Sequence, residues 1–172
     1  MTNKTFFMAS FLLLSCFSVA ADNYSIYLVR HAEKLDNSTD PNLSECGNQR
    51  AKQLSKMLSK TNISAIYSTK YQRTMQTAAP MSTLKHLKIE NYDPNDLEGF
   101  YLQLKQKKRS ALIVGHSNTT PVLTSFLTQQ EIAPLTEEDY QYLYQVQFVN
   151  DQPFLTILQQ TTSCQIPNKN AE

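Results

Sequence analysis

Short apolar runs alternate with helix-like segments along most of this 172-residue chain. Ser25–Val29, Ile63–Tyr67 and Ala111–Val114 are brief, β-rich runs without strict alternation of polar and apolar residues. Such runs are typical of strands that are buried on both faces. Leu87–Tyr92 forms a similar but more polar run. Because parallel strands need long crossover connections, strands that alternate with helices predict an α/β domain. We expect a three-layer α/β/α sandwich with a mostly parallel central sheet.

The expected helices follow these runs. Ser44 is a candidate N-cap for the first helix. A second helix should cover about residues 71–84, and it should break or restart near Pro80. A third opens at Pro94-Asn-Asp, and a fourth follows Gly115-His116.

The last forty residues or so have a different pattern. Tyr142–Val149 and Phe154–Gln159 resemble two strands joined at Asn150-Asp151. This arrangement predicts a hairpin at one edge of the sheet.

The N-terminus resembles an export signal. Lys4 provides a short positive region, residues 6–19 are apolar, and Ala20 and Ala21 offer small residues for cleavage. The apolar run is shorter than the roughly 20 residues that a membrane span needs. We therefore expect residues 1–21 to be a cleaved signal peptide and residues 22–172 to form one domain, periplasmic or secreted and without stable membrane insertion. A retained anchor and a lipidated Cys16 are the alternatives.

Two cysteines, Cys46 and Cys164, remain after cleavage. In an oxidising compartment they could form a disulfide if their Cα atoms approach within roughly 7 Å. Two unpaired thiols are equally compatible with the sequence.

Charge excludes some partner classes. The formal net charge is +1, and the one basic cluster, Lys105–Arg109, falls at the end of an expected helix, where cations are favourable. Nucleic acids and anionic membranes call for a larger basic face, so we expect neither as a partner.

Two arginines and two histidines are expected to meet at one edge of the sheet. Arg30-His31 closes the first strand, Arg73 lies in the first turn of the second helix, and His116 follows the strand Ala111–Val114. Ligands of such sheets bind beyond the carboxyl ends of the strands. Guanidinium groups match phosphate oxygens, and a neutral imidazole can attack phosphorus. This group therefore predicts a phosphate site.

Four segments in order resemble the motifs of the histidine phosphatase superfamily, which is phosphoglycerate mutase-like. They are Leu28–Glu33, Leu43–Gly47, Ile66–Thr77 and Ile113–Asn118. The resemblance implies that His31 is the nucleophile that becomes phosphorylated and that Arg30, Arg73 and His116 complete the phosphate pocket. Ala32 departs from the pattern, since the family usually has glycine there.

Two further roles are carried over from the family. Asn37 stands where some members place a phosphate-contacting side chain, although an ordinary turn asparagine is as compatible. The general acid is usually a carboxylate after the third strand, which indicates Asp93, with Glu98 and Glu90 as alternatives. Asp93 could instead cap the following helix.

The sequence thus predicts an exported phosphatase that hydrolyses phosphomonoesters, or a phosphoramidate, through a phosphohistidine on His31. Little chain is available for a lid, which favours a phosphatase over a mutase. The alternatives are a phosphatase of envelope glycans such as the lipopolysaccharide core, and a non-catalytic phosphate-binding protein. A small phosphorylated substrate is the expected partner, and we expect no cofactor. We also expect no metal site, because the two histidines lie beside arginines. One sequon, Asn118-Thr-Thr, lies beside His116, where a glycan would obstruct the site, so a bacterial periplasm fits better than a eukaryotic secretory route.

Overall fold

Six strands form one mixed sheet in the computed structural model, which describes residues 23–161. The order across the sheet is β3-β2-β4-β1-β5-β6. The strands are β1 (Tyr24–Arg30), β2 (Ala65–Ser68), β3 (Ile89–Asn91), β4 (Ala111–Gly115), β5 (Tyr142–Val149) and β6 (Gln152–Gln159). The expected signal peptide and Cys164 lie outside the described residues.

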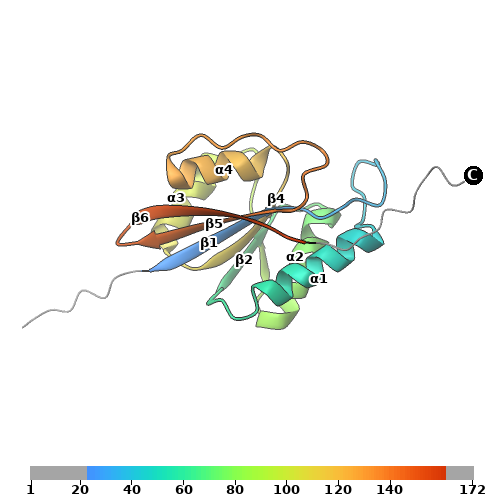
Figure 1. Cartoon of the computed structure of the whole chain (residues 1–172), viewed down its shortest axis with the longest axis horizontal. Helices are drawn as coiled ribbons and strands as arrows, with labels where there is room; N and C mark the ends of the chain where they lie inside the picture. Colours follow the sequence, from blue (N-terminus) through green and yellow to red (C-terminus); the bar gives the residue numbers. More distant parts are fainter. Residues whose placement is uncertain (1–22, 162–172) are drawn as a thin grey trace, which may run out of the picture.

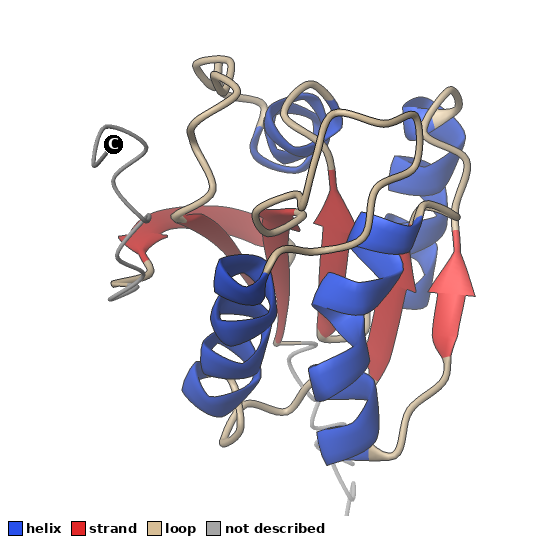
Figure 2. Ribbon diagram, turned by 90° about the vertical axis from the view of Figure 1, so that its right-hand side faces the viewer, coloured by secondary structure: helices blue, strands red, loops and turns tan. Residues whose placement is uncertain are grey.

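Helices cover both faces of this sheet. They are α1 (Glu45–Met57), α2 (Gln72–Lys85), α3 (Leu97–Lys107) and α4 (Thr119–Thr128). α1 packs beside α2 on one face, and α3 packs beside α4 on the other (Figures 1 and 2). The expected three-layer α/β/α sandwich is confirmed.

The first four strands are parallel, and the hairpin at one edge is antiparallel. β1 pairs in parallel with β4, and β5 pairs antiparallel with both β1 and β6. The β5–β6 turn places Asn150 and Asp151 at φ values of 51° and 62°. Two central residues with positive φ are typical of the two-residue turns whose twist matches that of the strands. The predicted hairpin is therefore confirmed.

The central strands are buried on both faces, as their uninterrupted apolar runs predict. Ile26 and Leu28 of β1 pack into one core cluster with Phe100 of α3, whereas Val29 packs into the opposite cluster with Leu54 of α1. β3 is only three residues long and lies at the edge, where its polar residue Glu90 is exposed. The sheet therefore fixes the direction of the strand ends that carry the candidate site.

One local expectation and one open alternative were wrong. α2 continues through Pro80 without a break, because Ala78 and Met81 on either side are buried in the core. Proline removes only its own hydrogen bond to the carbonyl four residues earlier, and tertiary packing offsets that loss here. The helix α3 is capped not by Asp93 but by Asp96, whose side chain accepts the Gly99 N–H at 2.9 Å.

Glycine is needed where backbones approach closely behind the candidate site. A Cβ on Gly47 of α1 would collide with the backbone oxygen of Glu33. A Cβ on Gly115 would lie 2.7 Å from Thr119 Oγ1 and 2.8 Å from the Tyr92 hydroxyl. These contacts bring α1 and α4 close to the chain that surrounds His31 and His116. Within residues 23–161, no helix is long and apolar enough to cross a membrane.

Candidate active site

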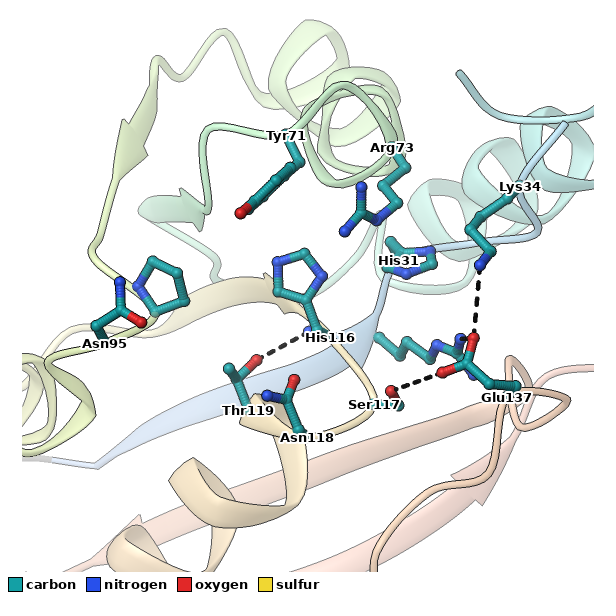
Figure 3. Close-up of a pocket in the computed structure, with 12 residues that line it drawn as sticks. His31, Lys34, Tyr71, Arg73, Asn95, His116, Ser117, Asn118, Thr119 and Glu137 are labelled. Carbon is teal, nitrogen blue, oxygen red and sulfur yellow. Dashed lines mark hydrogen bonds and ion pairs between the residues drawn. The ribbon is translucent and has the colours of Figure 1, made fainter. Parts of the chain in front are cut away.

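A cavity of about 380 Å³ opens at the carboxyl ends of the parallel strands (Figure 3). It is lined by Arg30, His31, Lys34, Tyr71, Arg73, Pro94, Asn95, His116, Ser117, Asn118, Thr119 and Glu137. The four residues that the sequence predicted to converge, Arg30, His31, Arg73 and His116, are all among them. The β1–β4 register places Arg30 opposite Gly115, and the His31 N–H donates to the Gly115 carbonyl at 2.9 Å. Strand pairing therefore sets the two histidines side by side.

His31 is presented as a neutral imidazole with one free ring nitrogen. Its Nδ1 lies 2.8 Å from the Ala32 carbonyl oxygen, which can only accept a hydrogen bond, so Nδ1 carries the proton. Burial, helped by the charges of Arg30, His116 and Arg73, lowers the pKa of His31 to about 3. Nε2 is therefore unprotonated at neutral pH. The structure thus provides an imidazole nitrogen with an available lone pair in the cavity.

His116 lies beside His31, with 5.6 Å between the ring centroids. Its Nε2 is 2.9 Å from the hydroxyl oxygen of Thr69, and its ring lies perpendicular to that of Tyr71, with 5.1 Å between the centroids. Burial, together with the charges of Arg73 and Arg30, lowers the pKa of His116 to about 4. Both histidines are therefore neutral near pH 7 in the empty cavity.

The arginines supply the positive charge. Three permanent cations line the cavity, Arg30, Arg73 and Lys34, against one carboxylate, that of Glu137. The buried Nε groups of Arg30 and Arg73 have no hydrogen-bond partner within the described part of the chain. Burying such donors is costly unless a ligand satisfies them. Their placement therefore favours an anion with several acceptor oxygens.

Helix N-termini add to this preference for anions. Ser117, Asn118 and Thr119 at the start of α4 line the cavity, and so does Arg73 in the first turn of α2. Neither helix has an acidic residue in its first turn. The exposed N–H groups and the dipole of a helix N-terminus stabilise bound anions.

The backbone that follows His31 is held firmly from two sides. The Ala32 N–H donates to Thr77 Oγ1 at 2.9 Å, and that hydroxyl donates to the Arg73 carbonyl at 2.7 Å. Thr77 thus connects the nucleophile segment to the turn that carries Arg73. Ala32 itself is fully buried and packs with two apolar neighbours, so this segment accommodates alanine where the family usually has glycine.

Glu33 stabilises the same segment through its contact with Arg50 of α1. Its two carboxylate oxygens share the Nε–H of Arg50, at 3.0 and 2.9 Å, and Oε1 also accepts from Nη2 of the same guanidinium. Both side chains are largely buried. Glu33 therefore supports α1 and the backbone next to His31 without lining the cavity.

Sequence reasoning missed Glu137 at the cavity mouth, although it placed Lys34 beside the pocket. Glu137, on the connection from α4 to β5, accepts from Arg30 at 3.0 Å and from Ser117 at 3.2 Å, and pairs with Lys34 at 3.5 Å. The Arg30 guanidinium is the main cause of the lowered pKa of Glu137. Nothing in the local sequence marks this loop glutamate, because its partner is 107 positions away in the chain. Asn95 at the mouth was also missed, because its bonds to Asp93 are those of an ordinary local turn.

The predicted proton donor, Asp93, lies beside the cavity: it lines an adjoining pocket that shares Tyr71 and Asn95 with the cavity. Asp93 Oδ1 accepts from the backbone N–H and the side-chain amide of Asn95, at 2.9 and 3.0 Å, in a local turn. Glu98 and Glu90 do not line the cavity, and neither does the exposed Asn37. Among the described residues, Glu137 is the one carboxylate that does.

Two further predictions concern cysteines and metals. Cys46 is disulfide-bonded, but Cys164 lies outside the described residues, so the pairing of these two cysteines stays a prediction. Within residues 23–161, no group of three or more His, Cys, Asp or Glu side chains is placed to hold a metal ion.

Comparison with known proteins connects this geometry to a family. Residues 26–94 match the model described as "Histidine phosphatase superfamily (branch 1)". The matched residues include Arg30, His31 and Arg73. This part of the chain, less than half of its length, is therefore similar to the histidine phosphatase superfamily.

A curated protein and a solved structure are also similar to this chain. Phosphoserine phosphatase 1 of Hydrogenobacter thermophilus is 37% identical over 75 residues, which are 40% of this chain and 36% of that protein. The match thus spans about a third of the curated relative. The protein histidine phosphatase SixA complexed with tungstate superposes with a TM-score of 0.64 at 16% identity, covering 78% of this chain and 96% of SixA.

A second solved structure is similar. Phosphoserine phosphatase from Entamoeba histolytica, in complex with 3-phosphoglyceric acid, gives a TM-score of 0.63 at 16% identity and covers 80% of this chain and 98% of its own. At such low identity these superpositions establish the fold alone, and the chemistry has to be argued from the cavity.

Proposed function

We propose that this protein is a phosphatase of the histidine phosphatase superfamily, which transfers phosphate from a small substrate to His31 and then to water. One observation carries the proposal. The Nδ1–H of His31 is held by the Ala32 carbonyl, so Nε2 faces the cavity as an unprotonated nucleophile between two arginines and a second histidine. This combination of nucleophile and anion-stabilising groups is what phosphoryl transfer requires.

The reaction proceeds in two displacements. His31 Nε2 attacks phosphorus, and the bond from phosphorus to the leaving-group oxygen breaks, so that oxygen departs with the electron pair and takes up a proton. Arg30, Arg73 and the N-terminus of α4 stabilise the charge on the transferring group. Water then attacks the phosphohistidine and the N–P bond breaks. Inorganic phosphate is released, and neutral His31 is regenerated.

Leaving-group chemistry narrows the substrate class. An alkoxide leaves poorly without a proton, and protonation contributes roughly a hundredfold or more. Asp93 is engaged with Asn95 outside the cavity lining, and Glu137 is paired with Arg30 as an anion. Substrates with good leaving groups, such as aryl phosphates or the phosphoramidate of a phosphohistidine, therefore fit this site better than alkyl phosphates.

The decisive experiment combines turnover with trapping of the intermediate. The mature domain should hydrolyse p-nitrophenyl phosphate, and His31→Ala should abolish the reaction. Rapid quenching with a labelled aryl phosphate should give an acid-labile, base-stable phosphoprotein with the label on His31. Turnover that survives His31→Ala would refute the mechanism, whereas phosphate binding without turnover in the wild type would support the non-catalytic alternative.

A substrate panel separates the remaining classes. We expect aryl phosphates and phosphoramidate to be cleaved at least tenfold faster than alkyl phosphates such as phosphoserine and 3-phosphoglycerate. Phosphorylated envelope glycans are alkyl phosphates, and preferential cleavage of these would favour the envelope phosphatase instead. Metal independence belongs to the same proposal, so EDTA should leave turnover unchanged.

Export is also part of the proposal, and it rests on the pattern of residues 1–21. A bacterial host should release a mature form that begins near residue 22, as N-terminal sequencing would show. Full-length protein in the cytoplasm would contradict export without affecting the proposed chemistry.

A further inference from the structure

A buried chain of hydroxyl groups lies behind His116, outside the cavity lining. Thr69, which follows β2, and Thr74 of α2 are both fully buried. Thr69 Oγ1 lies 2.9 Å from His116 Nε2 and 2.9 Å from Thr74 Oγ1. Thr74 Oγ1 in turn lies 2.8 Å from the Tyr71 carbonyl oxygen and 3.0 Å from the Thr69 carbonyl oxygen. The chain thus runs from the backbone through two hydroxyls to the imidazole.

The direction of every proton in this chain follows from counting donors. Carbonyl oxygens only accept, so the single proton of the Thr74 hydroxyl must point to one of the two carbonyls. Otherwise oxygen lone pairs would face each other at hydrogen-bond distance in a buried site. Thr74 Oγ1 then accepts from the Thr69 hydroxyl, whose one proton is thereby used. Thr69 Oγ1 can therefore only accept from His116, and Nε2 must carry the proton.

From this chain we infer that Thr69 is a positioning residue, which with Thr74 fixes His116 as the Nε2–H tautomer and directs its Nδ1 into the phosphate cavity. The two histidines are then held in opposite tautomers, His31 with the proton on Nδ1 and His116 with the proton on Nε2. Figure 3 shows the His116 ring between Tyr71 and His31. Nδ1 of His116 is thus available to the bound phosphate, either as an acceptor or, after taking up a proton, as a donor.

This inference rests on the proposed phosphatase function, because it assigns the orientation of a group in the same site. Removing the Thr69 hydroxyl leaves His116 free to exchange tautomers or rotate, which places the wrong nitrogen against the phosphate for part of the time. Loss of the hydroxyl should weaken stabilisation of the transition state more than it weakens ground-state binding. It should therefore lower kcat more than it raises KM.

Three variants test the role of Thr69. Thr69→Val keeps the shape and removes the hydroxyl, and it should lower kcat for p-nitrophenyl phosphate by about tenfold to a hundredfold with little change in KM. Thr69→Ser keeps the hydroxyl and should restore kcat to within about threefold of the wild type. The matched control is Thr124→Val, which removes an equally buried hydroxyl that only bonds within α4. It should leave kcat unchanged.

A spectroscopic measurement distinguishes this inference from the proposed function. The chain has three histidines, so nitrogen NMR of ¹⁵N-histidine-labelled protein can resolve each tautomer. His116 should be protonated on Nε2 in the wild type and in Thr69→Ser, and should show a tautomer mixture in Thr69→Val. A pure Nε2–H signal in Thr69→Val, or an Nδ1–H tautomer in the wild type, would overturn the inference. A correct tautomer without any turnover would refute the phosphatase and leave the hydroxyl chain standing.

Discussion

The floor and the mouth of the cavity are built in different ways. Arg30, His31 and His116 form the floor, at the ends of the adjacent strands β1 and β4, and Arg30 and His31 are only 3% exposed. Lys34, Asn95 and Glu137 form the mouth, on connections between elements, and the Glu137 side chain is 70% exposed. Strand pairing positions the floor, while ion pairs and local turns position the mouth. The sheet therefore fixes the phosphate chemistry, and the loops are free to select the rest of the substrate.

The largest expected difference is between two cations, one from each region. Arg30→Ala removes a buried guanidinium from the transferring phosphate and should lower kcat/KM about a hundredfold to a thousandfold. Lys34→Ala removes a partly exposed mouth charge and should cost at most about fivefold. Steady-state kinetics on an aryl phosphate measure both, with thermal unfolding as the check that each variant is folded. Equal decreases in kcat/KM would mean that the mouth and the floor contribute equally to phosphate binding and transfer.

The second prediction concerns what keeps the floor rigid. Glu33→Gln breaks the ion pair with Arg50 and leaves a largely buried cation unpaired, which should lower the free energy of unfolding by about 2–3 kcal/mol. Denaturant unfolding measures the change. Glu45→Gln, on the exposed side of the same helix α1, is the matched control and should stay within about 0.5 kcal/mol. If both variants behave alike, the segment after His31 is held by Thr77 and not by this pair.

The sequence predicts the floor far better than the mouth. Arg30-His31 and Gly115-His116 follow buried strands, and parallel strands in one sheet must bring such ends together, so these positions follow from the uninterrupted apolar runs. Glu137 reaches Arg30 from a loop whose path depends on the whole fold, and no period marks it. Asp93 shows the same limit: its position after β3 is correct, but its side chain direction is decided by the hydrogen bonds to Asn95. Pro80 shows that core packing can keep a helix continuous where proline alone predicts a break.

The third prediction uses the lowered pKa values of the floor histidines, about 3 for His31 and about 4 for His116. An unfolded histidine titrates near pH 6.5. Between pH 6.5 and 4 the unfolded state therefore binds protons that His31 and His116 do not bind in the folded protein. The two histidines therefore do not reduce the free energy of unfolding above pH 6.5, and they reduce it increasingly as the pH drops below that value. Thermal unfolding should therefore show Tm decreasing from pH 7 to pH 5, and the decrease should be smaller in His31→Gln. An unchanged decrease in that variant would assign the acid sensitivity to other groups.

The smallest expected effect belongs to the mouth. Glu137 occupies Arg30 and Lys34 in the empty cavity, so an arriving phosphate must compete with this carboxylate for the same donors. Glu137→Gln keeps the size of the side chain and removes the competing charge, and it should lower KM about threefold without changing kcat. The effect should shrink with added salt, because the mouth is exposed and its charges are screened. Glu138→Gln, an exposed neighbour, is the matched control.

The kinetic signature of Glu137→Gln decides what the mouth does. A lower KM at constant kcat means that the carboxylate acts only on ground-state binding, as an anion that substrate displaces. A higher KM for substrates that carry an ammonium group would make Glu137 a recognition residue. A fall in kcat confined to alkyl phosphates would make it the proton donor, since a bound phosphate dianion that displaces Glu137 from Arg30 would raise its pKa. In that case acid catalysis would belong to the mouth, and leaving-group preference would be set by a loop and not by the sheet.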